Sequence, residues 1–278
     1  RPIGVLLGLE ATANPFLFCA SYGEVAALPV PERVAALRDP ERKRRILAEH
    51  AELLAGLPDG LLRQIAGGFD ITFEMADPVD YELDASKSLG AEARRREADP
   101  AELVYDTLLQ SDGAQLLYLP LFNFAHGDFD DIHEMLTSPV ALYGLSDAGA
   151  HCGAICDASS TTSFLTVWAR DRREEQRLPV EQVVHQLTRA TAAHVGWLDR
   201  GLLAPGHVAA LNVIDLDALG CAPPRIAHDL PAGGRRLVQD ATGYRWTVKS
   251  GVPTFVDGEP TGERPGRLVR GTRPSPAP

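Results

Sequence analysis

The 278-residue chain has 38 acidic and 27 basic residues, a formal net charge of -11, and hydrophobic side chains at 45% of its positions. This composition is enough for one large domain, or for a medium-sized domain with an appendage, and allows a sizeable core. The acidic excess argues against a nucleic-acid partner or an acidic membrane, because phosphate groups are bound by concentrated positive charge.

The cysteines favour a reducing compartment. The four cysteines are too few and too scattered for a disulfide framework in a chain this long, so we expect a cytoplasmic protein. Cys152 and Cys156 have a C-x3-C spacing, but the second pair that a closed zinc site would need is missing. No apolar run approaches the ~18 to 20 residues that span a bilayer, so no membrane partner is expected.

The chain opens on a continuous apolar stretch, "RPIGVLLGL", which predicts a buried strand over residues 1–9. Arg1 stands where an initiating methionine would, and the strand follows at once. We therefore expect the sequence to be a piece of a longer polypeptide.

Residues 10–112 are expected to be mostly helical and irregular. Residues 40–56 and 99–111 carry apolar side chains at helical spacing, close behind Asp-Pro pairs that suit an N-cap and first turn. Between them, residues 69–75 have a strand-like composition. A segment this long between two buried strands exceeds an ordinary connection, which favours a lid or a binding insertion.

A more regular pattern follows. Residues 114–121 predict a strand, residues 128–139 a short helix and residues 140–145 another strand. A strand, a helix and a strand within ~30 residues are typical of a parallel βαβ unit. Because side chains at the carboxyl ends of parallel strands face the site, Asp147 becomes the first candidate for chemistry.

The rest of the chain changes from helical to β-rich. Two further helices are predicted around residues 159–172 and 178–195. From Gly201, short β-rich runs alternate with proline, glycine and aspartate turns, as in a small β domain. The proline-rich residues 272–278 are expected to be disordered.

Asp147 lies in the loop "GLSDAGAHCG" with Ser146 and His151. A carboxylate at this position can bind a metal ion or take a proton from a metal-bound water, although aspartates also cap turns after strands. Ser146 lacks the G-x-S-x-G elbow of a serine hydrolase. No nucleotide-binding glycine motif or P-loop is present either.

The ligand partners of Asp147 are harder to find. Among the eight histidines there is no H-x-H and no H-E-x-x-H pattern, so the ligands of a catalytic zinc are not visible. Only His126 and His151 lie near predicted strand ends, and each is a candidate for lining a site.

Four stretches carry a resemblance to a known family: residues 1–16, 117–157, 178–219 and 229–271. Together they resemble the C-terminal half of the N-acyl-D-amino-acid deacylases (D-aminoacylases) of the amidohydrolase superfamily. The most specific parts are the Ser-Asp-Ala loop around Asp147 and the stretch "RGLLAPGHVAALNVID".

The resemblance implies an α/β fold: residues 1–200 as the C-terminal part of a (β/α)8 TIM barrel, with an insertion at about 10–112, and residues 201–271 as part of a β-sandwich. It also implies zinc-dependent hydrolysis of an N-acyl-D-amino acid to a carboxylate and a D-amino acid. Asp147 matches the family's strand-eight aspartate, which contacts the metal site and carries the proton to the leaving amine. We assign His151 to substrate binding.

The family's H-x-H motif, its bridging ligand and its later histidines would all precede Arg1. We therefore expect most zinc ligands upstream of Arg1 and count the upstream half of the polypeptide as a partner. "HVAALNVID" also has Ala210 where the family usually has an aspartate. The alternative hypothesis is a catalytically silent remnant that serves binding or assembly. The acyl group, the D-amino acid, the number of zinc ions and the oligomeric state stay open.

Overall fold

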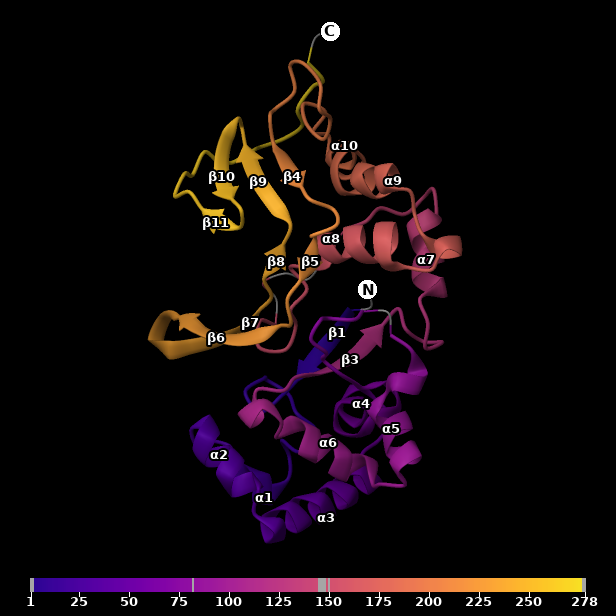
Figure 1. Ribbon diagram of the computed structural model, residues 1–278, viewed down its shortest axis with the longest axis vertical. Coiled ribbons are helices and arrows are strands. Elements are labelled where there is room, and N and C mark those ends of the chain that lie inside the picture. Colours follow the sequence, from indigo (N-terminus) through magenta and orange to yellow (C-terminus); the bar gives the residue numbers. More distant parts are fainter. Residues whose placement is uncertain (1–2, 82, 145–148, 150, 277–278) are drawn as a thin grey trace.

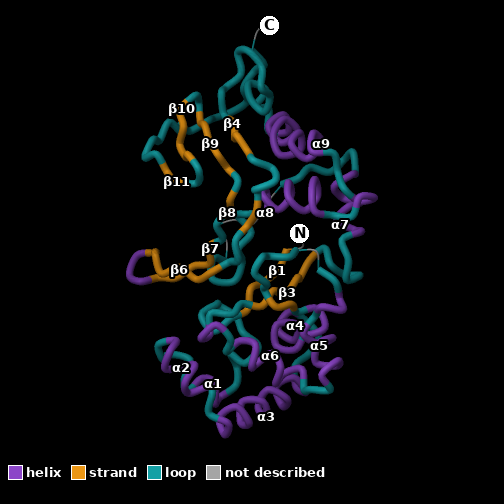
Figure 2. Tube along the Cα trace, in the orientation of Figure 1, coloured by secondary structure: helices purple, strands orange, loops and turns teal. Residues whose placement is uncertain are grey.

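The computed structural model describes residues 3–81, 83–144, 149 and 151–276. The molecule is elongated, with a lobe of helices α1–α6 at one end and the sheet of β4, β9, β10 and β11 toward the other (Figure 1). Helices α7 and α8 lie between these two regions, and α9 and α10 lie beside the sheet, all along one side of the molecule (Figures 1 and 2). No helix in the described part of the chain is long and apolar enough to cross a membrane.

The first sheet confirms the two apolar strands predicted near residues 1–9 and 114–121. It consists of β1 (Ile3–Leu7), β3 (Leu117–Phe122) and β2 (Phe73–Glu74), in the order β1-β3-β2. β1 and β3 pair antiparallel, with Val5 opposite Leu119. The strand-like residues 69–75 supply only β2, which follows a short 3₁₀ turn.

The predicted parallel βαβ unit is wrong. All pairs of named strands among the described residues are antiparallel, and residues 140–144 form no strand. A strand inside a parallel sheet is covered on both faces, whereas Val140 is 93% exposed and Leu142 is 42% exposed. The apolar run instead connects two elements, and its Tyr143 ring stacks on Phe164 at 4.1 Å.

The helical segment at residues 10–112 is confirmed as a lobe of six helices. These are α1 (Ala20–Gly23), α2 (Val30–Leu37), α3 (Pro40–Gly56), α4 (Leu61–Gly67), α5 (Leu89–Arg96) and α6 (Pro100–Leu108). The two Asp-Pro starts act as expected, because Asp39 caps α3 through the Arg42 amide and Asp99 caps α6. One buried cluster joins these helices to β1 and β3.

The second helical group confirms three further predicted helices. The first is α7 (Asp130–Thr137). The second is α8 (Ser160–Ser163), which continues as a π-helix over Phe164–Asp171. The third is α9 (Val180–His185), which continues through a π-helical turn, Gln186–Ala190, into α10 (Thr191–His194). Trp168 is 1% exposed and stacks on Phe129 at 6.0 Å, so the π-helix packs against the N-terminal end of α7.

The β-rich character predicted from Gly201 is confirmed as antiparallel strands. β4 (Leu211–Ile214), β9 (Tyr244–Lys249), β10 (Val252–Val256) and β11 (Glu259–Pro260) form a four-stranded sheet, in the order β11-β10-β9-β4. β5 (Gly220–Cys221) pairs with β8 (Ala241–Thr242), and β6 (Arg225–Leu230) pairs with β7 (Gly234–Val238) in a projecting ribbon (Figure 1). Further short 3₁₀ turns span Ala85–Lys87, Ser111–Gly113, Glu174–Gln176 and Pro231–Gly233.

Part of the segment for which disorder was predicted is docked. The amide of Arg273 donates to the Gly196 carbonyl at 2.7 Å, and its carbonyl accepts from the Leu198 amide at 2.9 Å. These two backbone hydrogen bonds attach residues 271–273 to the loop that follows α10.

Candidate functional site

The two residues singled out from the sequence differ in what the structure shows of them. Asp147 lies outside the described residues. His151 is described and exposed, in a left-handed conformation with φ 46°. Its carbonyl accepts hydrogen bonds from the Ala154 and Ile155 amides at 2.7 and 2.9 Å, so His151 begins a tight turn.

This turn is attached to two distant elements. The Leu6 amide in β1 donates to the Ala154 carbonyl, and the Leu237 amide in β7 donates to the Cys152 carbonyl, both at 2.7 Å. A third bond, from the Thr12 amide to the Gly153 carbonyl, is also 2.7 Å long. Residues 151–155 are therefore fixed beside the first sheet.

Gly153 is required by this close approach. A Cβ atom at Gly153 would lie 2.2 Å from the Thr12 hydroxyl oxygen, which is much shorter than any normal contact. The glycine thus lets the turn lie directly against the segment that follows β1.

The described residues do not form a metal site by themselves. Among them no three His, Cys, Asp or Glu side chains come close enough together to hold an ion. His126, the other histidine predicted near a strand end, is 73% exposed and lies 3.8 Å from Asp131. The described residues alone therefore do not complete a zinc site.

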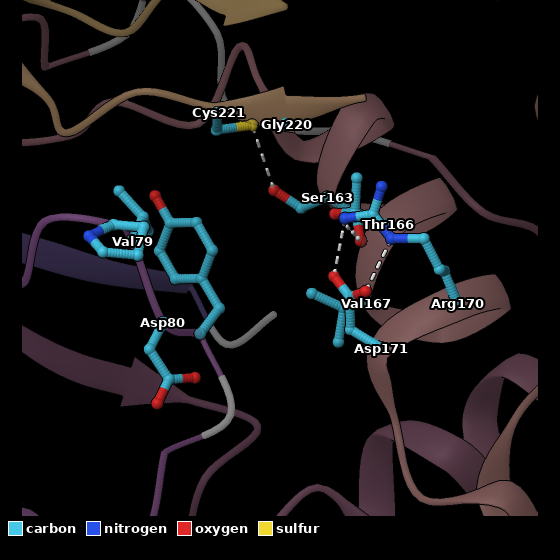
Figure 3. Close-up of a pocket in the computed structure, with 11 residues that line it drawn as sticks. Val79, Asp80, Ser163, Thr166, Val167, Arg170, Asp171, Gly220 and Cys221 are labelled. Carbon is cyan, nitrogen blue, oxygen red and sulfur yellow. Dashed lines mark hydrogen bonds and ion pairs between the residues drawn. The ribbon is translucent and has the colours of Figure 1, made fainter. Parts of the chain in front are cut away.

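A separate pocket of about 300 Å³ lies between three segments (Figure 3). It is lined by Pro78, Val79, Asp80, Tyr81, Ser163, Thr166, Val167, Arg170, Asp171, Gly220 and Cys221. The loop before residue 82, the continuous helix formed by α8 and the π-helix, and strand β5 supply these residues. The pocket is polar on one wall, where hydroxyl, carboxylate and guanidinium groups gather (Figure 3).

Arg170 in this pocket is already fully engaged. Its guanidinium forms a bidentate ion pair with Asp171, at 2.6 and 2.9 Å. It also donates to the carbonyls of Leu216 and Leu219, at 2.6 and 2.8 Å. Its pKa is raised, mainly by the bond to Asp171. Arg170 therefore joins the π-helix to the start of the β region and is a poor candidate for binding a substrate carboxylate.

The remaining polar groups form a hydrogen-bond network at the pocket edge. The Gln239 amide donates to the Tyr81 hydroxyl and to the Ala222 carbonyl, both at 2.8 Å. Ser163 donates to the Ser159 carbonyl at 3.1 Å and lies 4.0 Å from the Cys221 sulfur. None of the lining residues is a histidine, so the lining of this pocket offers Ser163 no imidazole as a general base.

Sequence reasoning missed this pocket. One signal was available: residues 159–163 read Ser-Ser-Thr-Thr-Ser, an unusual concentration of hydroxyl groups at the start of a helix. Phe124 near the end of β3 is buried in the core, and the partly buried Tyr143 packs against it. Phe124 lies edge-on to Phe73, and Tyr143 stacks on Phe164.

Comparison with known proteins places the chain in a broad group. Residues 24–255 match the amidohydrolase family. No curated protein gave a significant match.

Solved structures similar to this chain include a D-aminoacylase mutant in complex with copper chloride (19% identity, TM-score 0.40). Another is the D-aminoacylase described as defining a novel subset of amidohydrolases (21% identity, TM-score 0.38). A third comes from work on the binuclear metal centre of D-aminoacylase (18% identity, TM-score 0.35). The match to the first covers 73% of this chain and 38% of the solved one. The matches to the other two each cover 69% of this chain and 36% of the solved one. The chain thus spans little more than a third of the structures that it matches.

Proposed function

The chain belongs to the amidohydrolase family, and from that premise we propose that it is part of a zinc-dependent deacylase acting on N-acyl-D-amino acids. The reaction would hydrolyse the amide to a carboxylate and a free D-amino acid. The observation that carries the proposal is the family match over residues 24–255, which includes the whole loop around Asp147 and His151.

Within this proposal, Asp147 would be one of the residues that hold the metal ion and would carry the proton to the leaving amine, and His151 would bind substrate. The attachment of the His151 turn to β1 and β7 supports the second role, because it holds an exposed imidazole on a fixed backbone. The cysteine count, which is too low for a disulfide framework in a chain this long, supports the proposal of a cytoplasmic location.

The proposed architecture is a (β/α)8 barrel with a covering insertion over about 10–112 and a β-sandwich over 201–271. The helical lobe and the β-rich residues after Gly201 support the insertion and the sandwich. The antiparallel pairing of β1 with β3 does not support the barrel. The proposal further requires metal ligands from beyond the described residues, which we assign to a segment upstream of Arg1.

The experiment measures zinc by elemental mass spectrometry, and release of D-amino acid from N-acetyl-D-amino acids. It compares wild type with Asp147→Asn, and with Asp112→Asn as a matched control, since the Asp112 side chain is 94% exposed. Both measurements are made on the 278-residue chain and on the longer parent polypeptide that the proposal requires.

We expect zinc far below one equivalent on the 278-residue chain. In the parent polypeptide we expect hydrolysis that falls at least ~100-fold in Asp147→Asn and is unchanged in Asp112→Asn. Zinc near one equivalent on the shorter chain would overturn the assignment of upstream ligands. A zinc-loaded parent that releases no D-amino acid would overturn the deacylase proposal and favour a binding or assembly role.

A further inference from the structure

A second cavity, of about 610 Å³, lies at the far end of the β region. Its walls come from the loop after α10, the turn between β9 and β10, and residues 264–273. Five of its lining residues are basic and none is acidic: Arg200, Lys249, Arg264, Arg267 and Arg273. Such a concentration of positive charge is unexpected in a chain with a formal net charge of -11.

The sequence shows how the concentration arises. Arginine recurs at every third position in "RPGRLVRGTR", as Arg264, Arg267, Arg270 and Arg273, with no acidic residue between them. Three of these four line the cavity, and Arg270 does not. Arg270 belongs to the same repeat but lies outside the cavity lining, which makes it a matched control for Arg267.

Most of these cations are not neutralised by the protein. Arg200 pairs with Asp199 at 2.8 Å and lies over the Trp197 ring. In the described part of the chain, the other four form no ion pair, and Lys249 donates only to the Ser250 hydroxyl at 3.1 Å.

Asp199 is the carboxylate that pairs with Arg200. Its pKa is lowered, first by the hydrogen bond from Arg200 and to a smaller extent by the charge of Arg273. Arg273 therefore lies within electrostatic reach of the Arg200–Asp199 pair. The lining itself carries five cations and no carboxylate, so the cavity keeps a positive excess.

The cavity walls are held together by backbone hydrogen bonds. Arg273 forms two backbone hydrogen bonds, one with Gly196 and one with Leu198. The Gly251 amide donates to the Ala209 carbonyl at 2.9 Å. The Trp197 indole donates to the Gly271 carbonyl at 3.1 Å. Arg273 therefore lies on a backbone that is already fixed, which reduces the ordering cost of binding a ligand beside it.

We propose that this cavity binds a small multivalent oxyanion that carries two or more phosphate groups. Because like charges repel one another, a bound anion would stabilise the basic lining of the cavity. Guanidinium groups favour phosphate, because they form bidentate hydrogen bonds with its oxygens. The cavity volume lies within the range of small-molecule sites. A nucleic-acid strand fits less well, because its phosphates would extend over the acidic remainder of the surface.

The test is isothermal titration calorimetry of the 278-residue chain with inorganic tripolyphosphate. It compares wild type, Arg267→Gln and, as the matched control, Arg270→Gln, with folding verified by circular dichroism. We expect Arg267→Gln to weaken binding about tenfold or more, because a charge-assisted hydrogen bond is lost. Arg270→Gln should change the Kd by less than about twofold, and raising the salt concentration should weaken binding by wild type.

Three results would overturn the proposal. Wild type that does not bind tripolyphosphate at low salt would remove the site altogether. An equal loss in the two variants would show general attraction to a basic surface without a defined cavity. Tighter binding of a single-stranded oligonucleotide than of tripolyphosphate would replace a small-ligand site with a nucleic-acid site.

Discussion

The helical lobe and the β region are built in different ways. In the lobe, buried side chains from α1–α6, β1 and β3 form one cluster, in which Leu117 and Ile46 are 0% exposed. Between residues 201 and 276, the buried hydrophobic side chains are only Leu219 and Leu237. The lobe is thus held by apolar burial, and the β region chiefly by its hydrogen-bonded ladders.

This difference has consequences for function. The turn with His151 is hydrogen-bonded to β1 of the well-packed lobe and to β7 of the less buried region. The cationic cavity lies in the β region, where few side chains are buried. The proposed catalytic loop is therefore attached to a well-packed region. The proposed anion site is surrounded by a more open and polar region.

The largest expected effect is a core truncation in the lobe. Leu117→Ala should lower the free energy of unfolding by about 2 to 5 kcal/mol, because it leaves a cavity in β3 where Leu117 is 0% exposed. The matched change Leu203→Ala, at a side chain that is 92% exposed, should stay within about 0.5 kcal/mol of wild type. Urea denaturation followed by circular dichroism measures both.

Equal losses in the two leucine variants would contradict the comparison, because they would mean that the β region has a core of its own around Leu203. Two separate unfolding transitions, of which only one shifts in Leu117→Ala, would instead sharpen it by showing that the regions unfold independently.

Local structure was predictable where the signal lies within a few residues. The Asp-Pro start and the apolar spacing gave α3 its observed bounds, Pro40–Gly56. Strand pairing was not predictable in this way, because β1 pairs with β3 across the whole helical lobe. The short helix before Val140 suggested a parallel crossover, but the exposed residues 140–144 do not return to the sheet.

The two pockets and the proposed catalytic loop also differ in how far they could be predicted from the sequence. The loop around Asp147 could be proposed as a site from the sequence because its polar residues lie in one short stretch, and its role stays a prediction, since Asp147 lies outside the described residues. The pocket of Tyr81, Ser163 and Cys221 draws on three segments far apart in the chain, which no local pattern could bring together. The arginine repeat is visible in the sequence, but only the structure separates Arg270 from the cavity.

The next largest effect is a pH dependence confined to the lobe. His50 is 1% exposed, bonds the Ala66 carbonyl through Nε2 at 2.8 Å and packs on Phe16. Burial lowers its pKa below the usual value of about 6.5. The unfolded chain therefore takes up the proton first, so stability is complete above about pH 6.5 and is lost as the pH falls from there toward the folded pKa.

Thermal unfolding at about pH 7.5 and about pH 5.5 measures this loss, since ordinary carboxylates titrate below that window. In His50→Gln, whose amide can still donate to Ala66, the difference in Tm between the two pH values should shrink. If the difference in Tm is the same in His50→Gln as in wild type, His50 is not the group that causes the pH dependence.

The smallest effect is expected from the ion pairs of the β region. Arg245 in β9 pairs with Asp215 at 3.0 Å and with Asp257 at 3.4 Å, and lowers the pKa of Asp215 through a hydrogen bond. Its side chain is 55% exposed, so water and salt screen both pairs. Arg245→Gln should lower Tm slightly at low salt and not measurably at about 1 M salt, where the Debye length is about 3 Å. The exposed Arg235, changed to Gln, is the control for loss of charge alone. A loss in Arg245→Gln as large as in Leu117→Ala would mean that ion pairs, and not the strand ladders, hold the β region together.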